Sequence, residues 1–232
     1  MNGRKIDIGF YINADDIVVQ IRDRRFSFNE FAINVTQKRL QAFAVGSGLL
    51  SADFTEQQLK KSYHIRLNQL YLKDLSRLDQ LGQIVARFLR EAMLEEGRRF
   101  SFETVFSHPS NIATIQLAVK NGYKVYLYFV STESPEINKF RVAYRVSQHG
   151  HDVPAQKIVD RYARSLELLY DAAQYCYQVY FFDNSRDGSP FTLTAHFKKV
   201  GNRKVWDKIP KKNVAGWFKK YYLEKEKAGS SE

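Results

Sequence analysis

The sequence predicts an α/β protein built around a parallel sheet with helices on both faces. Short apolar segments alternate along the chain with longer segments of helical periodicity, which is the pattern of such sheets. The clearest apolar segments also stop at polar residues, as strands do when they lead into a ligand-binding loop. We expect residues 1–232 to form one domain, with strands at 8–13, 100–106, 123–130, 177–182 and 191–197.

The first strand, 8–13, is apolar and aromatic and stops at Asn-Ala-Asp-Asp, after which a helix is expected from about Ile17. Residues 28–96 are expected to form a helical insertion between the first two strands, because apolar residues recur there at spacings of three and four. The residues that carry this periodicity are Leu59, Tyr63, Leu67, Leu70 and Tyr71, followed by Leu78, Leu81, Val85, Phe88 and Leu89.

The later elements alternate regularly. Helices are expected at 109–121, at about 135–148, and from the end of the loop at Pro154 to about Ala173. The first of these stops at Gly122, a residue type favoured just past a helix end. Residues 123–130 are mostly aromatic or β-branched and give the clearest strand. Residues 191–197 alternate more strongly between polar and apolar, so we expect them at the edge of the sheet.

The chain is strongly basic, with 36 basic and 25 acidic side chains, a formal net charge of +11 and a pI near 9.6. Much of the excess lies in a basic C-terminal segment, 198–232, where aromatic residues such as Trp206 and Trp217 are interleaved with lysines. This segment either binds nucleic acid through phosphates and stacked bases, or docks its aromatic side on the protein and leaves its lysines in water. The sequence favours the second interpretation, because a lysine-rich tail is only a weak indication of nucleic-acid binding.

Several classes of protein are disfavoured by what the chain lacks. No apolar run approaches the roughly 18 residues of a membrane-spanning helix, and the first twenty residues have no signal peptide's apolar segment. Cys176 is the one cysteine, which rules out an internal disulfide and multi-cysteine zinc sites. His149 and His151 have no third ligand at a recognised spacing, so no metal site is expected. We therefore expect a cytoplasmic globular protein without membrane contact.

Polar residues gather where the expected strands end, and the carboxyl ends of parallel strands meet at one edge of a sheet. They are Asn13 and Asp15, Glu103 and Thr104, Ser131 and Thr132, and Asp183 and Asn184. Asp15 and Asp16 are either an N-cap with a first-turn acid, or acids that deprotonate a hydroxyl nucleophile or help to hold a metal. Burying Glu103 within strand 100–106 would be costly, so it indicates either a partly open site or an internal ion pair.

Four arginines form two pairs, each on one helix face. Arg141 and Arg145 lie one helical turn apart, as do Arg161 and Arg164. Forked guanidinium groups on both sides of a loop are suited to clamping a phosphoryl group. The alternative is a pair of solvated helices with salt bridges to Glu136, Asp160 or Glu167.

Five segments stand out in order: FYINADDI (10–17), RRFSFETVFSHPSN (98–111), NGYKVYLYFVSTESPEIN (121–138), RVSQHGHDVPAQKIVDRYARSLELL (145–169) and YFFDNS (180–185). In this order they resemble the zeta-toxin-like family of P-loop kinases, in particular its chromosomal bacterial branch. The resemblance covers the chain from Phe10 to about Lys220, and the third and fourth segments are long enough to be specific.

The resemblance implies a P-loop-kinase-like sheet and transfer of the ATP γ-phosphoryl group, with Mg²⁺, to a sugar hydroxyl. In the toxins the acceptor is UDP-N-acetylglucosamine, and an antitoxin-like protein is a possible partner. By position, Asp15 resembles the family's general base, and Arg145 and Arg161 resemble its catalytic arginines. Arg141 and Arg164 are expected to bind phosphate. Asn13, Asp16, Glu103 and Thr104 are expected to bind the acceptor.

The sequence departs from the family at the phosphate-binding loop. A P-loop reads G-x-x-x-x-G-K-[ST], yet none of the 12 glycines here is followed by lysine. In the family this loop and its strand precede the INADD segment, and removing that strand would expose two neighbouring strand edges. We expect either a fragment or a degenerate homologue that has lost ATP binding. These residues alone are expected to be an inactive kinase, or alternatively a non-catalytic homologue that binds a partner or nucleic acid.

Overall fold

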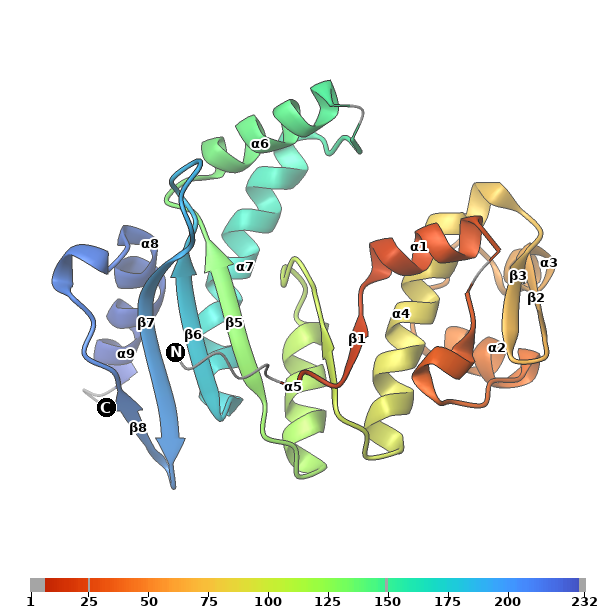
Figure 1. Ribbon diagram of the computed structural model, residues 1–232, viewed down its shortest axis with the longest axis horizontal. Helices are drawn as coiled ribbons and strands as arrows, with labels where there is room; N and C mark the ends of the chain where they lie inside the picture. Colours follow the sequence, from red (N-terminus) through yellow and green to blue (C-terminus); the bar gives the residue numbers. More distant parts are fainter. Residues whose placement is uncertain (1–6, 25, 149, 230–232) are drawn as a thin grey trace. The chain divides into compact units, whose positions relative to one another are not determined.

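The computed structural model describes residues 7–24, 26–148 and 150–229. The chain is of the α/β class, as the sequence predicts, with mixed strand pairs and with helices packed against them (Figure 1). Its internal contacts divide it into two compact units, unit 1 up to Thr104 and unit 2 from Val105. Each unit has its own hydrophobic core. Along the described residues, no helix combines the length and the apolar character needed to cross a membrane.

Unit 1 pairs its first and last strands in parallel. β1 (Phe10–Ile12) lies beside β4 (Phe100–Phe102). α1 (Ala14–Arg22) follows β1 directly, and α4 (Leu78–Glu95) precedes β4. The elements between α1 and α4 are a 3₁₀ helix (Phe28–Phe31), α2 (Gln37–Gly46), α3 (Glu56–Ser62), β2 (Tyr63–Arg66), β3 (Gln69–Leu72) and a 3₁₀ turn (Leu75–Arg77).

The prediction that residues 28–96 are helical is wrong for the part from Tyr63 to Leu72. β2 and β3 form an antiparallel hairpin there, with Tyr63 opposite Leu72. The two turn residues, Leu67 and Asn68, both have left-handed backbone, with φ of 51° and 59°. Two such residues form the tight turn whose twist matches the flanking strands. Leu67 therefore stands at a turn, 81% exposed, and belongs to no helix face.

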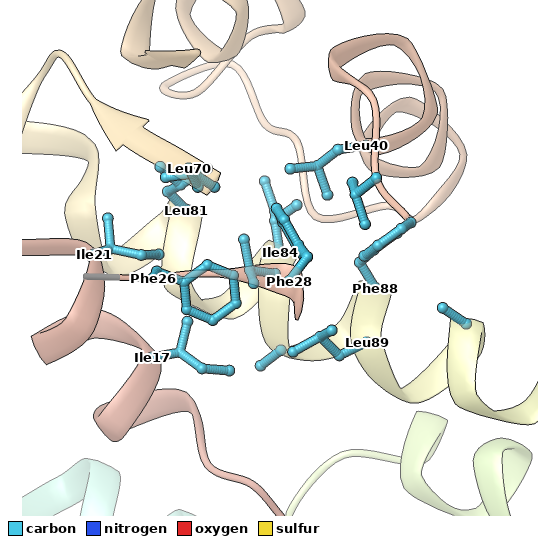
Figure 2. Close-up of a cluster of buried hydrophobic side chains, with 14 of the residues drawn as sticks. Ile17, Ile21, Phe26, Phe28, Leu40, Leu70, Leu81, Ile84, Phe88 and Leu89 are labelled. Atoms are coloured by element: carbon cyan, nitrogen blue, oxygen red, sulfur yellow. The ribbon is translucent and has the colours of Figure 1, made fainter. Parts of the chain in front are cut away.

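The core of unit 1 lies where α1 and α4 meet the hairpin and the preceding loop. Figure 2 shows Ile17 and Ile21, one turn apart on α1, pointing toward a stripe on α4 that includes Leu81, Ile84, Phe88 and Leu89. This stripe confirms the helical periodicity predicted for that part of the chain. A Cβ on Gly82 would clash with the side chain of Val18. Because glycine has no Cβ, α1 can lie close against α4 at this position.

Unit 2 contains a mixed four-stranded sheet in the order β5-β6-β7-β8. The first two strands run parallel, and the other neighbours are antiparallel. The strands are β5 (Tyr126–Ser131), β6 (Gln178–Asp183), β7 (Thr192–Val200) and β8 (Arg203–Trp206). The helices are α5 (Ser110–Lys120), α6 (Pro135–Ser147), α7 (Ala155–Tyr175), a 3₁₀ turn (Lys211–Asn213), α8 (Gly216–Phe218), a π-helical turn (Lys219–Leu223) and α9 (Glu224–Gly229).

Two details of the predicted sheet are wrong. Among the described strand pairs, β1–β4 and β5–β6 are parallel, and β7 returns antiparallel beside β6. The predicted edge strand 191–197 becomes β7, which is covered on its far side by β8. β8 was not predicted, and it follows β7 through a two-residue turn that begins at Gly201, where φ is 58°. The polar character of β7 does not reflect an edge position, because Thr194 and His196 are buried within the sheet.

The basic C-terminal segment docks its aromatic side on unit 2, as the second interpretation predicts. Trp217 and Phe218 are each 2% exposed, and Tyr222 is fully buried. The Phe218 and Tyr222 rings contact Phe181 of β6 at centroid distances of 4.7 and 4.9 Å. These three rings are therefore not available to stack on bases.

The opposite face of the same sheet is lined by tyrosines. Tyr126 and Tyr128 of β5 are 49% and 50% exposed. Across the strands, Tyr128 lies opposite Tyr180 of β6, and Tyr180 lies opposite His196 of β7. We call this surface the tyrosine face. β5, at its margin, pairs with β6 and has no second partner among the described strands.

Candidate functional site

Asn13 organises the end of β1. Its side-chain oxygen accepts hydrogen bonds from the backbone N–H groups of Asp15 (2.8 Å) and Asp16 (3.3 Å). Asn13 is therefore the N-cap of α1, which corrects the interpretation of Asp15 as a capping residue. Asp15 and Asp16 lie in the first turn, where the helix dipole favours negative charge. The Asp15 carboxylate has no hydrogen bond or ion pair among the described residues and faces solvent.

The same Asn13 side chain connects β1 to β4. Its Nδ2 group donates to Glu103 Oε2 (3.3 Å) and to the Tyr11 hydroxyl oxygen (3.1 Å). The hydrogen bond from Asn13 lowers the Tyr11 pKa, but partial burial and the Glu103 carboxylate outweigh it, so the Tyr11 pKa is raised. Glu103 itself follows β4 and is exposed. Of its two interpretations, the internal ion pair is therefore wrong, and the partly open site stays a prediction.

A pocket of about 220 Å³ lies beside this network within unit 1. Its wall includes Asn13 and Asp16, two of the predicted acceptor-binding residues, and also Gln20 and Glu30. The Gln20 side-chain oxygen is buried and has no hydrogen-bond partner among the described residues. The remaining wall is apolar or aromatic, from Phe10, Tyr11, Ile17 and Phe31. The pocket combines hydrogen-bond acceptors with ring surfaces, which suits a ligand rich in hydroxyl or N–H donors.

We expect Asn13→Ala to destabilise unit 1 by about 1 kcal/mol, the usual cost of losing an N-cap. Asn13→Ser keeps a capping oxygen and removes the donor to Glu103, so it is expected to cost only a few tenths of that. Urea unfolding followed by far-UV circular dichroism compares the two variants. Equal losses for Ser and Ala would show that the link to Glu103, and not the cap, stabilises this end of β1.

The four predicted arginines all lie in unit 2, on α6 and on the first half of α7. These helix segments extend beyond the carboxyl ends of β5 and β6 (Figure 1). Arg141 donates two hydrogen bonds to Asp187 Oδ1 (2.7 and 3.1 Å), and Arg145 donates to the His151 carbonyl (3.0 Å). Arg161 and Arg164 have no ion pair among the described residues.

The alternative prediction, that these arginines form salt bridges with acids of their own helices, is therefore wrong. Glu136 pairs with Lys139 (3.3 Å), and Asp160 accepts from Gln156 (2.8 Å). The one arginine ion pair here, with Asp187, leads to the loop after β6. Two guanidinium groups, those of Arg161 and Arg164, thus remain available for an anion on one face of α7.

Polar residues at the ends of β5 and β6 have structural partners. Asp183 Oδ1 accepts from Trp217 Nε1 (3.1 Å) and from the Ser185 hydroxyl (2.7 Å). The Glu133 carboxylate accepts from the backbone N–H groups of Gly216 (2.7 Å) and Trp217 (3.2 Å). The Tyr162 hydroxyl donates to the Thr132 carbonyl (2.8 Å), and burial raises the Tyr162 pKa to about 12. These carboxylates therefore anchor the C-terminal helices.

The structure brings together Asn13, Asp15, Asp16 and Glu103 in unit 1, and Thr104 follows Glu103 directly. In unit 2 it gathers the four arginines on two packed helices. The two units are described separately, so convergence of the carboxylates with the arginines stays a prediction. His149 lies outside the described residues, and no group of three potential metal-binding side chains occurs among those described. Cys176 is fully buried and burial raises its pKa to about 12, which fits an inert core thiol.

Sequence reasoning did not identify Tyr11, Gln20 and Glu30 as parts of the site. Gln20 lies two helical turns after Asn13, and a helix that begins at a strand end can direct such a residue back toward that end. That signal was available in the sequence. Glu30 offered no comparable signal, because it enters through a 3₁₀ helix that the periodicity did not reveal.

Comparisons with protein-family models, with curated proteins and with solved structures returned no match to this chain.

Proposed function

We propose that this chain is the acceptor-binding and phosphate-facing part of an ATP-dependent phosphotransferase of zeta-toxin type. Its acceptor is a hydroxyl group of a sugar or a nucleotide sugar. One observation carries the proposal. The Asn13 link to Glu103 holds the exposed Asp15 carboxylate where two parallel strands end, and this is where α/β sheets place their ligands.

In this mechanism Asp15 accepts the proton of the acceptor hydroxyl as its oxygen attacks the γ-phosphorus of ATP. The new O–P bond forms while the bond from phosphorus to the β,γ-bridging oxygen breaks, and ADP leaves. Arg145 and Arg161, assisted by Arg141 and Arg164, neutralise the charge on the transferring group. The availability of Arg161 and Arg164 supports this role, since an arginine already held by a carboxylate would lose that pair.

Asn13, Asp16, Glu103 and Thr104 orient the acceptor in this proposal. The pocket next to Asp16 supports it, because its carboxylate and amide oxygens accept hydrogen bonds from hydroxyl groups. Mg²⁺ is usually held by nucleotide phosphates and by one or two carboxylates. Asp16, in the same helix turn as Asp15, offers one such carboxylate without forming a metal site of its own.

The nucleotide phosphates also need a glycine-rich loop, which the sequence does not contain. β5 supports the proposal that a further strand provides it. The strand is six residues long, belongs to a parallel pair and has an open edge among the described strands. Edges of this kind are normally covered, charged or shortened. The sequence of β5, Tyr-Leu-Tyr-Phe-Val-Ser, carries neither charge nor proline and is not shortened.

The test is to express the gene from the nearest in-frame start upstream of Met1 and to measure transfer of ³²P from γ-labelled ATP to a panel of sugars and nucleotide sugars. We expect an upstream Gly-Lys-Ser/Thr loop, transfer by the extended protein, and none by the 232-residue chain. The absence of an encoded loop, or a loop-bearing protein that binds MgATP and transfers nothing, would contradict the proposal. Either result would favour the non-catalytic alternative, a homologue that binds a protein partner.

A further inference from the structure

The tyrosine face of unit 2 holds a ladder of stacked rings that ends at the open margin of the sheet. The Tyr128 and Tyr180 rings are nearly parallel, at 3°, with centroids 4.8 Å apart. The Tyr180 ring in turn stacks on His196 at 4.0 Å. His196 is fixed from both sides, by Asp207 Oδ2 at 2.9 Å and by Gln178 Oε1 at 3.2 Å. Tyr128, on the edge strand, is half exposed and can accept one more planar group.

Two lysines lie at the end of the sheet where β5 and β6 begin and β7 ends. Lys124 Nζ and Lys198 Nζ lie 5.1 and 5.6 Å from the centre of the Tyr177 ring. Tyr177 also contacts Tyr126 edge-on, at 5.5 Å. Neither lysine has an ion pair among the described residues. Two ammonium groups around one ring, with no carboxylate paired to them, form a site that attracts an anion.

We propose that the tyrosine face binds single-stranded nucleic acid, with a base stacked on Tyr128 and phosphates bound by Lys124 and Lys198. The occupant follows from charge and shape together. The chain carries a net charge of +11, and flat rings next to unpaired lysines match a polymer that alternates planar bases with phosphates. Modules that bind single-stranded RNA use exposed aromatic residues on a four-stranded sheet in the same way. Asp207 is the carboxylate on this face, and His196 already engages it.

This site differs from the one that the basic C-terminal segment first suggested. Trp217, Phe218 and Tyr222 of that segment are buried in the core of unit 2, whereas Tyr126 and Tyr128 are half exposed. The proposed site also lies at the opposite end of β5 from the arginines of α6. The two proposals therefore rest on different side chains.

The probe is fluorescein-labelled U₁₂ or dT₁₂, with a 12-base-pair duplex for comparison, titrated with the 232-residue chain and followed by fluorescence anisotropy. We expect both single strands to bind and the duplex to bind at least tenfold more weakly, because taking a base out of the duplex stack costs free energy. The slope of log K against log salt concentration is expected near −1.4, from two phosphate contacts at about −0.7 each. Equal binding of duplex and single strands would overturn the stacking proposal.

Tyr128→Leu keeps an apolar side chain and removes the aromatic face, and we expect it to weaken binding about 5-fold to 100-fold. Tyr128→Phe keeps the ring and is expected to bind as the parent does. The matched control is Tyr144→Leu, at a tyrosine of α6 that is 64% exposed, and no change is expected there. The double variant Lys124→Gln, Lys198→Gln is expected to flatten the salt slope.

Three results would overturn the proposal. The first is binding lost in Lys211→Gln, Lys212→Gln but retained in Tyr128→Leu, which would move the site to the C-terminal segment. The second is an equal effect of Tyr128→Leu and Tyr144→Leu. The third is no binding of either oligonucleotide together with self-association that Tyr128→Leu abolishes in sedimentation velocity, which would make the face a contact between copies of the chain.

Discussion

Asp15→Asn is expected to lower phosphoryl transfer by the loop-bearing protein about a thousandfold, within the 10²–10⁴ range of general-base catalysis. The amide cannot accept the hydroxyl proton, while its size and its place in the first turn of α1 are unchanged. MgATP affinity is expected to stay the same, because Asp15 acts on the acceptor and not on the nucleotide. The measurements are single-turnover transfer of labelled phosphate and equilibrium binding of a fluorescent ATP analogue.

Two aspartates on the same helix act as controls for this prediction. Asp23→Asn lies at the other end of α1, where Asp23 is paired with Arg22, and it is expected to leave transfer unchanged. Asp16→Asn is expected to raise KM for the acceptor with a smaller effect on kcat, because Asp16 lines the pocket. Full activity in Asp15→Asn would remove Asp15 from the mechanism, and an equal loss in Asp23→Asn would reveal a charge effect on the helix alone.

The sequence predicts elements well where one periodicity dominates. α5, α6 and α7 begin and end within a few residues of their predicted positions, and β5 and β6 overlap the apolar runs that suggested them, each ending one residue later. The hairpin of β2 and β3 was missed because two periodicities coincide there. Tyr63 and Leu70 are both buried, at a spacing that a helix also allows. The deciding residues, Leu67 and Asn68, are set by turn geometry.

Sheet topology was harder to predict, because strand order depends on contacts distant in sequence. β8 has the sequence Arg-Lys-Val-Trp, which shows no alternation of polar and apolar residues. It forms because Trp206 packs against Phe197 of β7 at 4.9 Å and against Tyr222 of the C-terminal segment at 5.7 Å. No local signal in residues 203–206 shows that a ring from 16 residues later will cover the tryptophan.

The candidate site was only partly predictable, because some of its contacts also join residues that are distant in sequence. Asn13, Asp15 and Glu103 were identified because polar residues after apolar strands are a local signal, and the parallel register of β1 and β4 then brings Asn13 and Glu103 together. The roles of Glu133 and Asp183 were not predictable. Glu133 accepts hydrogen bonds from the backbone of Gly216 and Trp217, and Asp183 accepts one from the Trp217 indole. Only the docked C-terminal segment places those donors at the ends of β5 and β6.

Phe181→Ala is expected to destabilise unit 2 by about 3–5 kcal/mol, the range for removing a fully buried phenylalanine. Phe181 is completely buried in β6, where its ring contacts Phe218 and Tyr222. The loss therefore leaves a cavity and also loosens the C-terminal segment from the sheet. Such a cost is a large share of the roughly 5–15 kcal/mol that stabilises a domain. With a urea m-value near 2 kcal/mol/M, the midpoint is expected to fall by about 2 M.

The position of the tryptophans makes this prediction specific to one unit. Trp206 and Trp217, the two tryptophans of the chain, both belong to unit 2, so their fluorescence follows its unfolding alone. Phe28→Ala is the matched control, since Phe28 is equally buried in the separate core of unit 1, where its ring meets Phe26 edge-on. It is expected to shift the far-UV circular dichroism transition and to leave the fluorescence midpoint in place. Equal fluorescence shifts in both variants would mean that the two cores unfold as one cooperative structure. If Phe181→Ala does not fold, Phe181→Leu leaves a smaller cavity and takes its place in the comparison.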